Sequence, residues 1–303
     1  RFTMTQTADG PNGISANCLK LDCTTADTSI AAGERLNLWH RIEGQNLQRI
    51  GKGVAGAKEI TVSFYVKANA AFTFGCELFD SDNTRQITKL FDTTTGWVRH
   101  ELTFPADVDD GSSPFDDDNA VSMTLEFWIH SGSTYTSGTL NATAWANSTS
   151  ANRAAGIDSF FSSTDNNFFL TGVQIEVGPV ATEFEQEDIS TTLAKCQRYF
   201  QDLCTGHGSE GILNLGYYDA TRAFGSVQLI TEMRTAPTVA FSDETHLTVF
   251  TNSASSNSTA ISPEKSAKKS VEFRVTTTAR TAGHSAFART NNGDASITFD
   301  AEL

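Results

Sequence analysis

The stretch TGVQIEVGPVATEFE, from Thr171 to Glu185, has the pattern of a β-strand that ends abruptly near the middle of the chain. Its apolar residues Val173, Ile175 and Val177 alternate with polar ones, and a period of two is typical of a strand with one face in a core. Gly178-Pro179 then ends the run, because proline has no amide hydrogen to donate to a sheet. We therefore interpret this stretch as the closing strand of a β domain that is followed by a second one.

Length and composition favour two domains built from strands. The chain has 303 residues, which exceeds the usual size of a single domain. Only 19% of the residues are charged, while Thr, Ser, Asn and Gly are abundant, and this balance favours strands over helices. The formal net charge of -14 argues against attraction to nucleic acid or to anionic membranes. No apolar run is long enough to cross a bilayer, so we expect neither a nucleic-acid partner nor membrane insertion.

Strand patterns fill the chain before Gly178, separated by turn clusters rich in Gly, Asn and Asp. The predicted strands are residues 36–42, 59–67, 72–79, 97–104, 121–130 and 168–177. Short strands at regular spacing, without amphipathic helices between them, predict an antiparallel sandwich of the jelly-roll kind. Residues 131–167 are rich in Ser, Thr, Asn and Ala and are predicted to form long loops with room for one short strand.

A single helix is predicted after this domain, over residues 188–203. Ile189, Leu193, Cys196, Phe200 and Leu203 form one apolar stripe with coiled-coil spacing. Two heptads are too short to be stable alone, so the stripe is expected to pack on a domain or on copies of itself around a symmetry axis. Three of these residues, Ile189, Leu193 and Phe200, are therefore candidate oligomer or domain contacts.

Strand patterns return in the last third of the chain. The predicted strands are residues 212–218, 224–232, 246–250, 270–277 and 295–301, and residues 251–269 are predicted to form an exposed loop. The predicted fold class is therefore all-β: a jelly-roll β-sandwich joined by a short helix to a second β-sandwich domain. The predicted boundaries are residues 1–185 for the jelly roll, 186–205 for the linker and helix, and 206–303 for the C-terminal domain.

Alternation along each strand separates a core face from a polar face. Several aromatic residues fall on polar faces, beside side chains that donate and accept hydrogen bonds. Flat aromatic rings against the C–H faces of sugar rings, with charged or amide groups on the hydroxyls, are the mixture that sugar binding needs. The candidate glycan-binding residues are Trp39, Arg41, Glu43, Tyr65, Glu126 and Trp128.

Packing is the alternative explanation for these aromatic residues. The loops at residues 131–167, the helix or a neighbouring subunit would cover such a face equally well. Trp97 follows Gly96 at the very start of its strand and is expected to be structural.

Motifs for enzymatic chemistry are missing from the sequence. There is no GxSxG, HExxH or P-loop lysine motif. The glycines of GKGVAG, residues 51–56, have dinucleotide-binding spacing but precede a predicted strand instead of a helix, so we interpret them as a flexible turn. Glu101 and Glu126 are the one candidate glycosidase pair, and isolated strand carboxylates are more often solvated surface groups. We expect that the protein is not an enzyme.

The cysteine and carboxylate patterns likewise do not predict a catalytic centre. The five cysteines contain no CxxC pair, so free buried thiols and no catalytic or structural metal are expected. An acidic loop offers oxygen ligands for calcium but lacks EF-hand spacing, and a solvated loop is the preferred interpretation. The loop carboxylates are Asp107, Asp109, Asp110, Asp116, Asp117 and Asp118. No cofactor is expected, with structural calcium as the alternative.

Several of these segments resemble one family of bacteriophage proteins. The opening stretch followed by KCQRYF, residues 195–200, resembles the junction of many phage virion and tail-fibre-like proteins, between a carbohydrate-binding-module-like jelly roll and a C-terminal β domain. RIEGQNLQ, ITVSFYVKA and GWVRHELTF, at residues 41–48, 60–68 and 96–104, are similar to internal strands of that jelly roll. MRTAPTV and ITFDAEL, at residues 233–239 and 297–303, are similar to the C-terminal domain.

The resemblance implies a non-enzymatic virion protein that is assembled in the host cytoplasm. A tail fibre or other appendage is expected, in which a homo-oligomer, with a trimer expected, contacts other virion proteins and polysaccharide on the host surface. The alternative is a purely structural capsid fibre, head decoration or tail connector whose aromatic face packs on a partner. A surface-glycan hydrolase is a third possibility.

Overall fold

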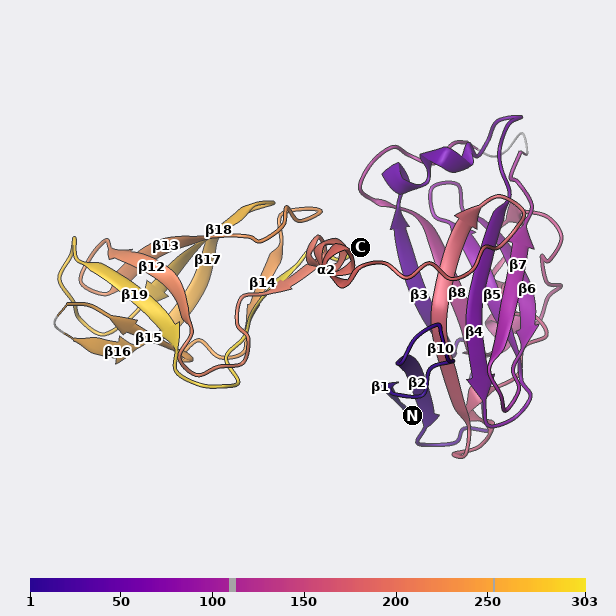
Figure 1. Cartoon of the computed structure of the whole chain (residues 1–303), viewed down its shortest axis with the longest axis horizontal. Coiled ribbons are helices and arrows are strands. Elements are labelled where there is room, and N and C mark those ends of the chain that lie inside the picture. The colour runs from indigo at the N-terminus through magenta and orange to yellow at the C-terminus, as the bar shows by residue number, and fades with distance from the viewer. Residues whose placement is uncertain (109–112, 253) are drawn as a thin grey trace. The chain divides into compact units, whose positions relative to one another are not determined.

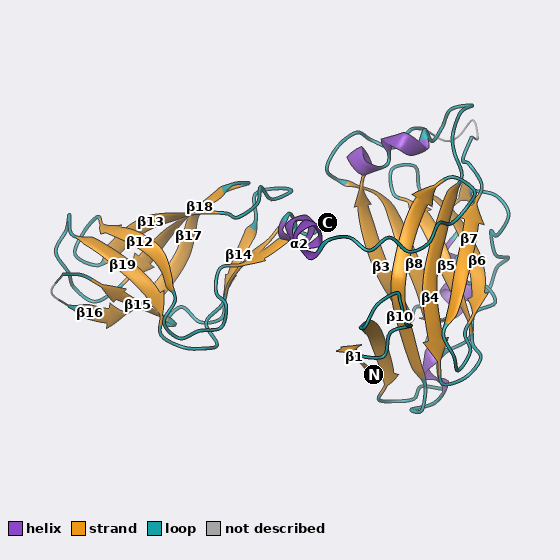
Figure 2. Cartoon of the chain, in the orientation of Figure 1, coloured by secondary structure: helices purple, strands orange, loops and turns teal. Residues whose placement is uncertain are grey.

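The chain folds into two compact units, and a computed structural model describes residues 1–108, 113–252 and 254–303 of it. One unit comprises residues 1–186 and the other residues 187–302. Strands dominate both units (Figures 1 and 2). The predicted all-β fold is confirmed: a jelly-roll β-sandwich is joined by a short helix to a second β-sandwich. Within the described ranges, no helix is both long and apolar enough to span a membrane.

Two antiparallel sheets form the N-terminal unit. Sheet A has the order β1 (Phe2–Thr7), β2 (Cys18–Cys23), β10 (Asn167–Val177), β4 (Ile60–Ala68) and β7 (Val98–Phe104). Sheet B has the order β3 (Arg35–Glu43), β8 (Val121–Ser131), β5 (Thr73–Asp80), β6 (Arg85–Asp92) and β9 (Ala146–Asn147). Strands adjacent in space are often distant in sequence, as expected for a jelly roll.

The core of this unit lies between the two sheets. Val62, Phe64 and Val66 of β4 are fully buried, as alternation predicts. Alternate residues of β8, from Met123 to Ile129, belong to the same hydrophobic cluster. The assignment of core faces from residue parity is therefore confirmed for these strands.

Three strands of the N-terminal unit were not predicted from the sequence: β1, β2 and β6. β9 is the one short strand for which the loops at residues 131–167 left room. β6 has the sequence RQITKLFD, and its first four residues are all buried although three of them are polar. Buried polar residues break the alternation by which a strand is recognised, so the pattern of β6 was hidden. The helical pieces of this unit are short: α1 (Ser133–Thr136), η1 (Gly44–Asn46), η2 (Gln48–Ile50), η3 (Ser150–Asn152) and η4 (Phe160–Ser162).

The stretch that suggested the fold forms most of β10, and its first glycine has a structural role. Gly172 has a φ of 59°, a left-handed conformation that glycine adopts without strain. The register between β10 and β4 shifts between Thr171 and Gln174, at this glycine. A Cβ at Gly172 would lie 3.0 Å from Cδ2 of Tyr65. The glycine therefore permits both the shift in register and the close approach of Tyr65.

The polar side chains of β10 hold the chain that follows the strand. Glu176 accepts hydrogen bonds from Thr182, from its amide at 3.0 Å and from its hydroxyl at 2.6 Å. Gln174 donates to the hydroxyl of Thr182 and accepts from the amide of Glu185 at 2.8 Å. Thr61 donates to the carbonyl oxygen of Gly178. In the opening stretch, Ile175 packs against the core and the polar side chains anchor residues 178–185, whereas Val173 and Val177 are exposed, which corrects the core face predicted from the alternation.

The C-terminal unit also consists of two sheets. The larger has the order β16 (Ser255–Asn257), β15 (Leu247–Phe250), β19 (Ser285–Thr290), β12 (Gly211–Tyr217), β13 (Arg222–Gln228), β18 (Ser270–Thr276) and β17 (Ala260–Ala267). The smaller has the order β11 (Phe200–Asp202), β20 (Ile297–Asp300) and β14 (Thr238–Phe241). One hydrophobic cluster, which includes Val271, Phe273 and Phe299, fills the space between them.

The helix of the C-terminal unit is shorter than predicted. α2 (Ile189–Gln197) begins after Asp188, whose carboxylate accepts a hydrogen bond from the amide of Ser190 at 2.9 Å. Residues 200–202 form β11 and pair with β20, so the prediction of a helix through residue 203 is wrong beyond Gln197. Pairing with a strand almost a hundred residues away overrides the local apolar stripe.

Residues 251–269 differ from the exposed loop that was predicted. β16 and β17 both lie in this range, and residue 253 is outside the described residues. β17 pairs with β18 at the edge of the larger sheet and exposes residues 263–267. An edge strand with polar, exposed residues has the composition of a loop, and this explains the error. β14 and β19 were also missed.

Candidate functional site

The six candidate glycan-binding residues do not lie on one surface. Trp39, Arg41 and Glu43 belong to β3, and Glu126 and Trp128 to β8, and these strands are neighbours in sheet B. Tyr65 belongs to β4 of sheet A. The grouping of Tyr65 with the others is therefore corrected. Parity separates inside from outside on each strand, but it does not tell which of two sheets a strand joins.

Trp128 lies on the face of sheet B that points away from the core, yet it is fully buried. Its indole Nε1 donates a hydrogen bond to Oε2 of Glu77 at 2.7 Å. Glu126, which is 4% exposed, accepts from the side-chain amide of Asn37 at 2.8 Å. As the structure stands, neither Trp128 nor Glu126 presents a surface to a sugar, and this corrects their assignment as direct contacts.

The covering segment is the loop region of residues 132–166, and its key residue is Arg153. The guanidinium of Arg153 donates to both oxygens of Glu77, with the shortest bond at 2.8 Å, and to Oε1 of Glu126 at 3.0 Å. It also lies over the rings of Phe79 and Trp128, 4.6 and 5.0 Å from their centres. Packing by the chain itself, one of the two explanations for the aromatic face, is therefore correct for Trp128.

Glu77 is the most perturbed acid of this cluster. Burial raises the pKa of its carboxyl to about 7; the hydrogen bonds and charge of Arg153 oppose this change, and the neighbouring Glu126 adds to it. Two buried carboxylates share one arginine, so a proton on Glu77 balances the charge of the cluster. Glu77 was missed by the sequence analysis, because a glutamate within a strand is usually an exposed residue.

Glu43 is also buried and accepts a hydrogen bond from the side chain of Gln45 at 2.5 Å. Its assignment as a direct glycan contact is corrected for the same reason. What stays exposed on this face is a short strip along β3. Trp39 is 45% exposed, and the guanidinium carbons of Arg35 and Arg41 lie 5.4 and 5.3 Å from the centre of its ring.

Tyr135, from the covering segment, extends this exposed surface. Its hydroxyl accepts a hydrogen bond from Arg35 at 3.4 Å, and its ring is 5.4 Å from the same guanidinium. The rings of Tyr135 and Trp128 are 5.2 Å apart, so the exposed residues rest on the buried ones. We call Arg35, Trp39, Arg41 and Tyr135 the Trp39 strip. Two of these residues, Trp39 and Arg41, were predicted, and Arg35 and Tyr135 were not.

Tyr65 has a structural position on the outer face of sheet A. It packs near Gly172, and the guanidinium of Arg99 lies 5.9 Å from its ring. Arg99 in turn pairs with Glu101 at 2.6 Å. Glu101 is on β7 of sheet A and Glu126 on β8 of sheet B, so the two carboxylates do not face each other across one sugar-binding surface.

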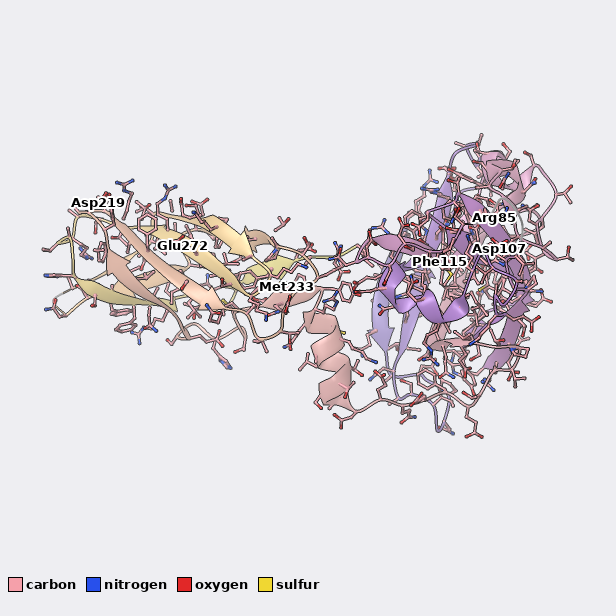
Figure 3. All side chains as sticks on the ribbon, turned by 90° about the horizontal axis from the view of Figure 1, so that it is seen from above. Arg85, Asp107, Phe115, Asp219, Met233 and Glu272 are labelled. Atoms are coloured by element: carbon pink, nitrogen blue, oxygen red, sulfur yellow. The ribbon has the colours of Figure 1, made fainter. Side chains whose placement is uncertain are left out.

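A second buried charge cluster joins the loops at one end of this unit. Lys52 pairs with Asp80 at 2.6 Å, and Arg85 forms two hydrogen bonds of 2.8 Å with Asp107. The ring of Phe115 lies 5.1 Å from the ammonium of Lys52, and Arg85, Asp107 and Phe115 are all buried (labelled in Figure 3). The positive φ angles of Gly51 and Gly53, 64° and 78°, form the turn that directs Lys52 inward. The glycines of GKGVAG were predicted as a turn, but the buried lysine between them was not.

This buried charge cluster contains Asp107, one of the carboxylates of the acidic loop that was the candidate for calcium binding. Asp107 is already bound by Arg85, and Asp109 and Asp110 lie outside the described residues. Among the residues that the structure does describe, no group of three or more His, Cys, Asp or Glu is placed to hold a metal ion. The five cysteines are all free; Cys196 is exposed, whereas the other four are buried as predicted.

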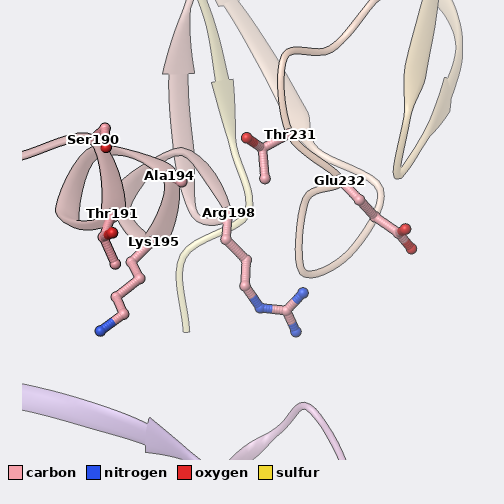
Figure 4. A pocket seen from close by; sticks show the side chains of 7 residues that line it. All are labelled: Ser190, Thr191, Ala194, Lys195, Arg198, Thr231 and Glu232. Atoms are coloured by element: carbon pink, nitrogen blue, oxygen red, sulfur yellow. The ribbon is translucent and has the colours of Figure 1, made fainter.

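The three predicted contact residues of the helix region are exposed, and they do not share one helix. Ile189 and Leu193 on α2 are 78% and 53% exposed. Phe200 is 45% exposed but lies on β11 opposite Asp300, so its assignment to the helical stripe is corrected. Another side of α2 lines an open pocket, whose lining includes Lys195, Arg198, Thr231 and Glu232 (Figure 4). Lys195 is paired with Glu187, and the pocket is shallow.

Comparisons with known proteins give similarities to solved structures alone. No family model matches the chain, and no curated protein matches it. The CBM22-1 xylan-binding domain of Xyn10C from Paenibacillus barcinonensis is 13% identical, with a TM-score of 0.29, over 59% of this chain and 83% of that domain. The family 11 carbohydrate-binding module from Clostridium thermocellum is 11% identical, with a TM-score of 0.28, over 60% and 85% of the two chains. The fold assignment rests on the strand order described above.

Proposed function

We propose that this chain is a non-enzymatic component of a bacteriophage virion whose N-terminal unit binds glycans on the host surface. The observation that carries the proposal is the Trp39 strip. An exposed tryptophan stays on a sheet face whose other tryptophan, Trp128, is covered by the chain itself. A half-exposed indole with flanking guanidinium groups offers a flat stacking surface and several hydrogen-bond donors, which suits a sugar ring.

The place in the virion is proposed from the sequence. The Thr171–Glu185 stretch and the KCQRYF segment resemble the domain junction of phage tail-fibre-like proteins. A tail fibre or another appendage therefore suits the chain, with polysaccharide and other virion proteins as partners and no cofactor. The exposed Ile189 and Leu193 on α2 support self-association, since a nine-residue helix with no buried residue gains little from packing on its own unit. We propose a homotrimer.

A purely structural role is the second candidate, and one observation favours it. The outer face of sheet B is covered by residues 132–166, and this covering leaves a narrow strip for a ligand. In that role the strip would contact another virion protein.

A titration distinguishes glycan binding at the Trp39 strip from packing of the strip against another virion protein. Host-surface polysaccharides are added to the protein, and tryptophan fluorescence is measured for the native chain and for Trp39→Ala. Tyr218→Ala is the matched control, because Tyr218 is 73% exposed on the other unit. We expect saturable quenching that is lost in Trp39→Ala and kept in Tyr218→Ala. Quenching that persists in Trp39→Ala, or none in the native chain, would contradict glycan binding at the strip.

A further inference from the structure

The Trp39 strip is positively charged on a chain that is strongly acidic. The chain carries 36 acidic and 22 basic residues, yet two arginines flank the exposed tryptophan. In the parts of the chain that the structure describes, no Asp or Glu side chain forms an ion pair with Arg35 or Arg41. Arg35 donates a hydrogen bond to the hydroxyl of Tyr135, and Arg41 donates one to the main-chain oxygen of Leu303. On a protein that repels anions overall, this local exception requires an explanation.

Three carboxylates on or beside the strands of the strip are engaged elsewhere. Glu126 pairs with Trp39 across the strands, but its oxygens are bound by Arg153 and Asn37. Glu43 is buried and bonded to Gln45. Glu34, the neighbour of Arg35, is held by Arg1 at 2.6 Å. These contacts leave the positive charge of the two arginines without an acidic side chain to neutralise it at the surface.

We infer that the Trp39 strip selects acidic polysaccharides whose sugar rings carry carboxylates, such as uronic acids. Both guanidinium groups lie beside the indole ring of Trp39. A sugar stacked on this ring is therefore close enough for either arginine to donate hydrogen bonds to it. The planar fork of arginine binds a carboxylate through two parallel hydrogen bonds, and it stays charged at every physiological pH. The indole would hold the apolar face of the ring while one arginine binds its carboxylate. This inference deepens the proposed glycan binding and rests on it.

The test compares one polymer with and without its charge. Polygalacturonate, the same polymer with its carboxylates reduced to alcohols, and dextran sulfate are titrated into the intact chain by calorimetry at low and physiological salt. We expect polygalacturonate to bind at least about tenfold more tightly than the reduced polymer and more tightly than dextran sulfate. Higher salt should weaken this binding, because ion pairs at an exposed surface are screened.

Variants separate the arginines from general charge. Arg35→Gln and Arg41→Gln remove one guanidinium each, and Arg49→Gln removes an exposed arginine outside the strip as a control. We expect the first two to lose most of the preference for polygalacturonate and the control to keep it. Equal binding of charged and reduced polymers, both lost in Trp39→Ala, would overturn the inference and leave glycan binding intact. An equal preference for dextran sulfate would overturn carboxylate selection, and failure to bind any saccharide would overturn both.

Discussion

Arg153 covers part of the outer face of sheet B and leaves another part exposed. One guanidinium bonds two buried carboxylates and lies over two aromatic rings, so this side chain ties the covering segment to the outer face of sheet B. Trp39 and Trp128 occupy equivalent outward positions on neighbouring strands. Only Trp128 lies beneath Arg153, and this difference separates a packing residue from a candidate binding residue.

Removal of Arg153 should be strongly destabilising. Arg153→Ala leaves Glu77 and Glu126 buried without their cation, and breaking such an arrangement typically costs about 3–5 kcal/mol. Urea denaturation measures the change in the free energy of unfolding, and a red shift of the Trp128 fluorescence would report exposure of the face. Arg49→Ala, at an exposed arginine, should change stability little. A loss of less than about 1 kcal/mol would contradict the role given to Arg153.

Stability should depend on pH through Glu77. Because burial raises the pKa of Glu77 to about 7, above the value of about 4.3 in an unfolded chain, the folded protein binds this proton more tightly. The contribution of Glu77 is then fully present below about pH 4.3 and is lost as the pH rises through 7.

Glu77→Gln keeps a hydrogen-bonding side chain and removes the titration. We expect the free energy of unfolding of the native chain to decline more steeply from pH 5 to pH 8 than that of Glu77→Gln, measured by urea denaturation across the range. The same slope for both proteins would show that Glu77 does not hold a proton in the folded state.

At the scale of elements, β10 shows what a sequence pattern can predict. Its alternation identified a strand and its end, because both depend on local residues. The predicted core face is wrong for two of its three residues, since Val173 and Val177 are exposed and only Ile175 packs against the core. The shift in register at Gly172 depends on Tyr65, which is more than a hundred residues away, and was not predicted. For the same reason, parity placed Tyr65 outside the core but could not place it in sheet A.

Gly172→Ala tests the glycine of β10. A residue with a Cβ at a φ of 59° costs about 1–2 kcal/mol, and the new methyl group would also press on Tyr65 at 3.0 Å. Gly13→Ala is the control, since Gly13 has a φ of 80° with no atom within 4 Å of the added Cβ. Thermal denaturation should show a larger loss for Gly172→Ala. Equal losses would mean that the contact with Tyr65 is not tight.

The helix α2 shows the opposite limit of sequence analysis. The apolar stripe from Ile189 to Leu203 predicted sixteen helical residues, but the segment after Gln197 pairs as β11 with the far end of the chain. The apolar period predicted the helix correctly as far as Gln197. It failed after that residue, because the backbone of residues 200–202 forms hydrogen bonds with a distant strand instead.

Leu193→Glu tests self-association through the shortened helix. If copies of α2 pack together, a charge at this apolar position should dissociate the oligomer, because burying it without a partner is costly. The mass in solution, measured by light scattering, should fall to that of a monomer, while Thr191→Glu, on another side of the helix, should leave it unchanged. The trimer proposal fails if the native chain is already a monomer, or if Leu193→Glu has the native mass.

At the scale of the whole molecule, two β units with separate cores place the proposed function in the first. The fold class was predictable because composition and strand spacing determine it. The candidate site was half predictable: Trp39 and Arg41 were identified from their strand, whereas Arg35 had no distinguishing neighbour and Tyr135 comes from a loop. Burial of Glu126 and Trp128 required knowledge of the covering segment, and burial of Glu43 required knowledge of the turn that brings Gln45 against it.

The central claim is that a sugar stacks on Trp39 and not on the buried tryptophans. NMR spectra of the chain with 15N-labelled tryptophan resolve the indole N–H signals, and each is assigned by a single Trp→Phe variant. When polygalacturonate is added, stacking on Trp39 predicts a saturable shift of the Trp39 signal. The signal of Trp128, which lies beneath Arg153, should stay unchanged. A shift of Trp128 alone, or of no tryptophan, would contradict this claim.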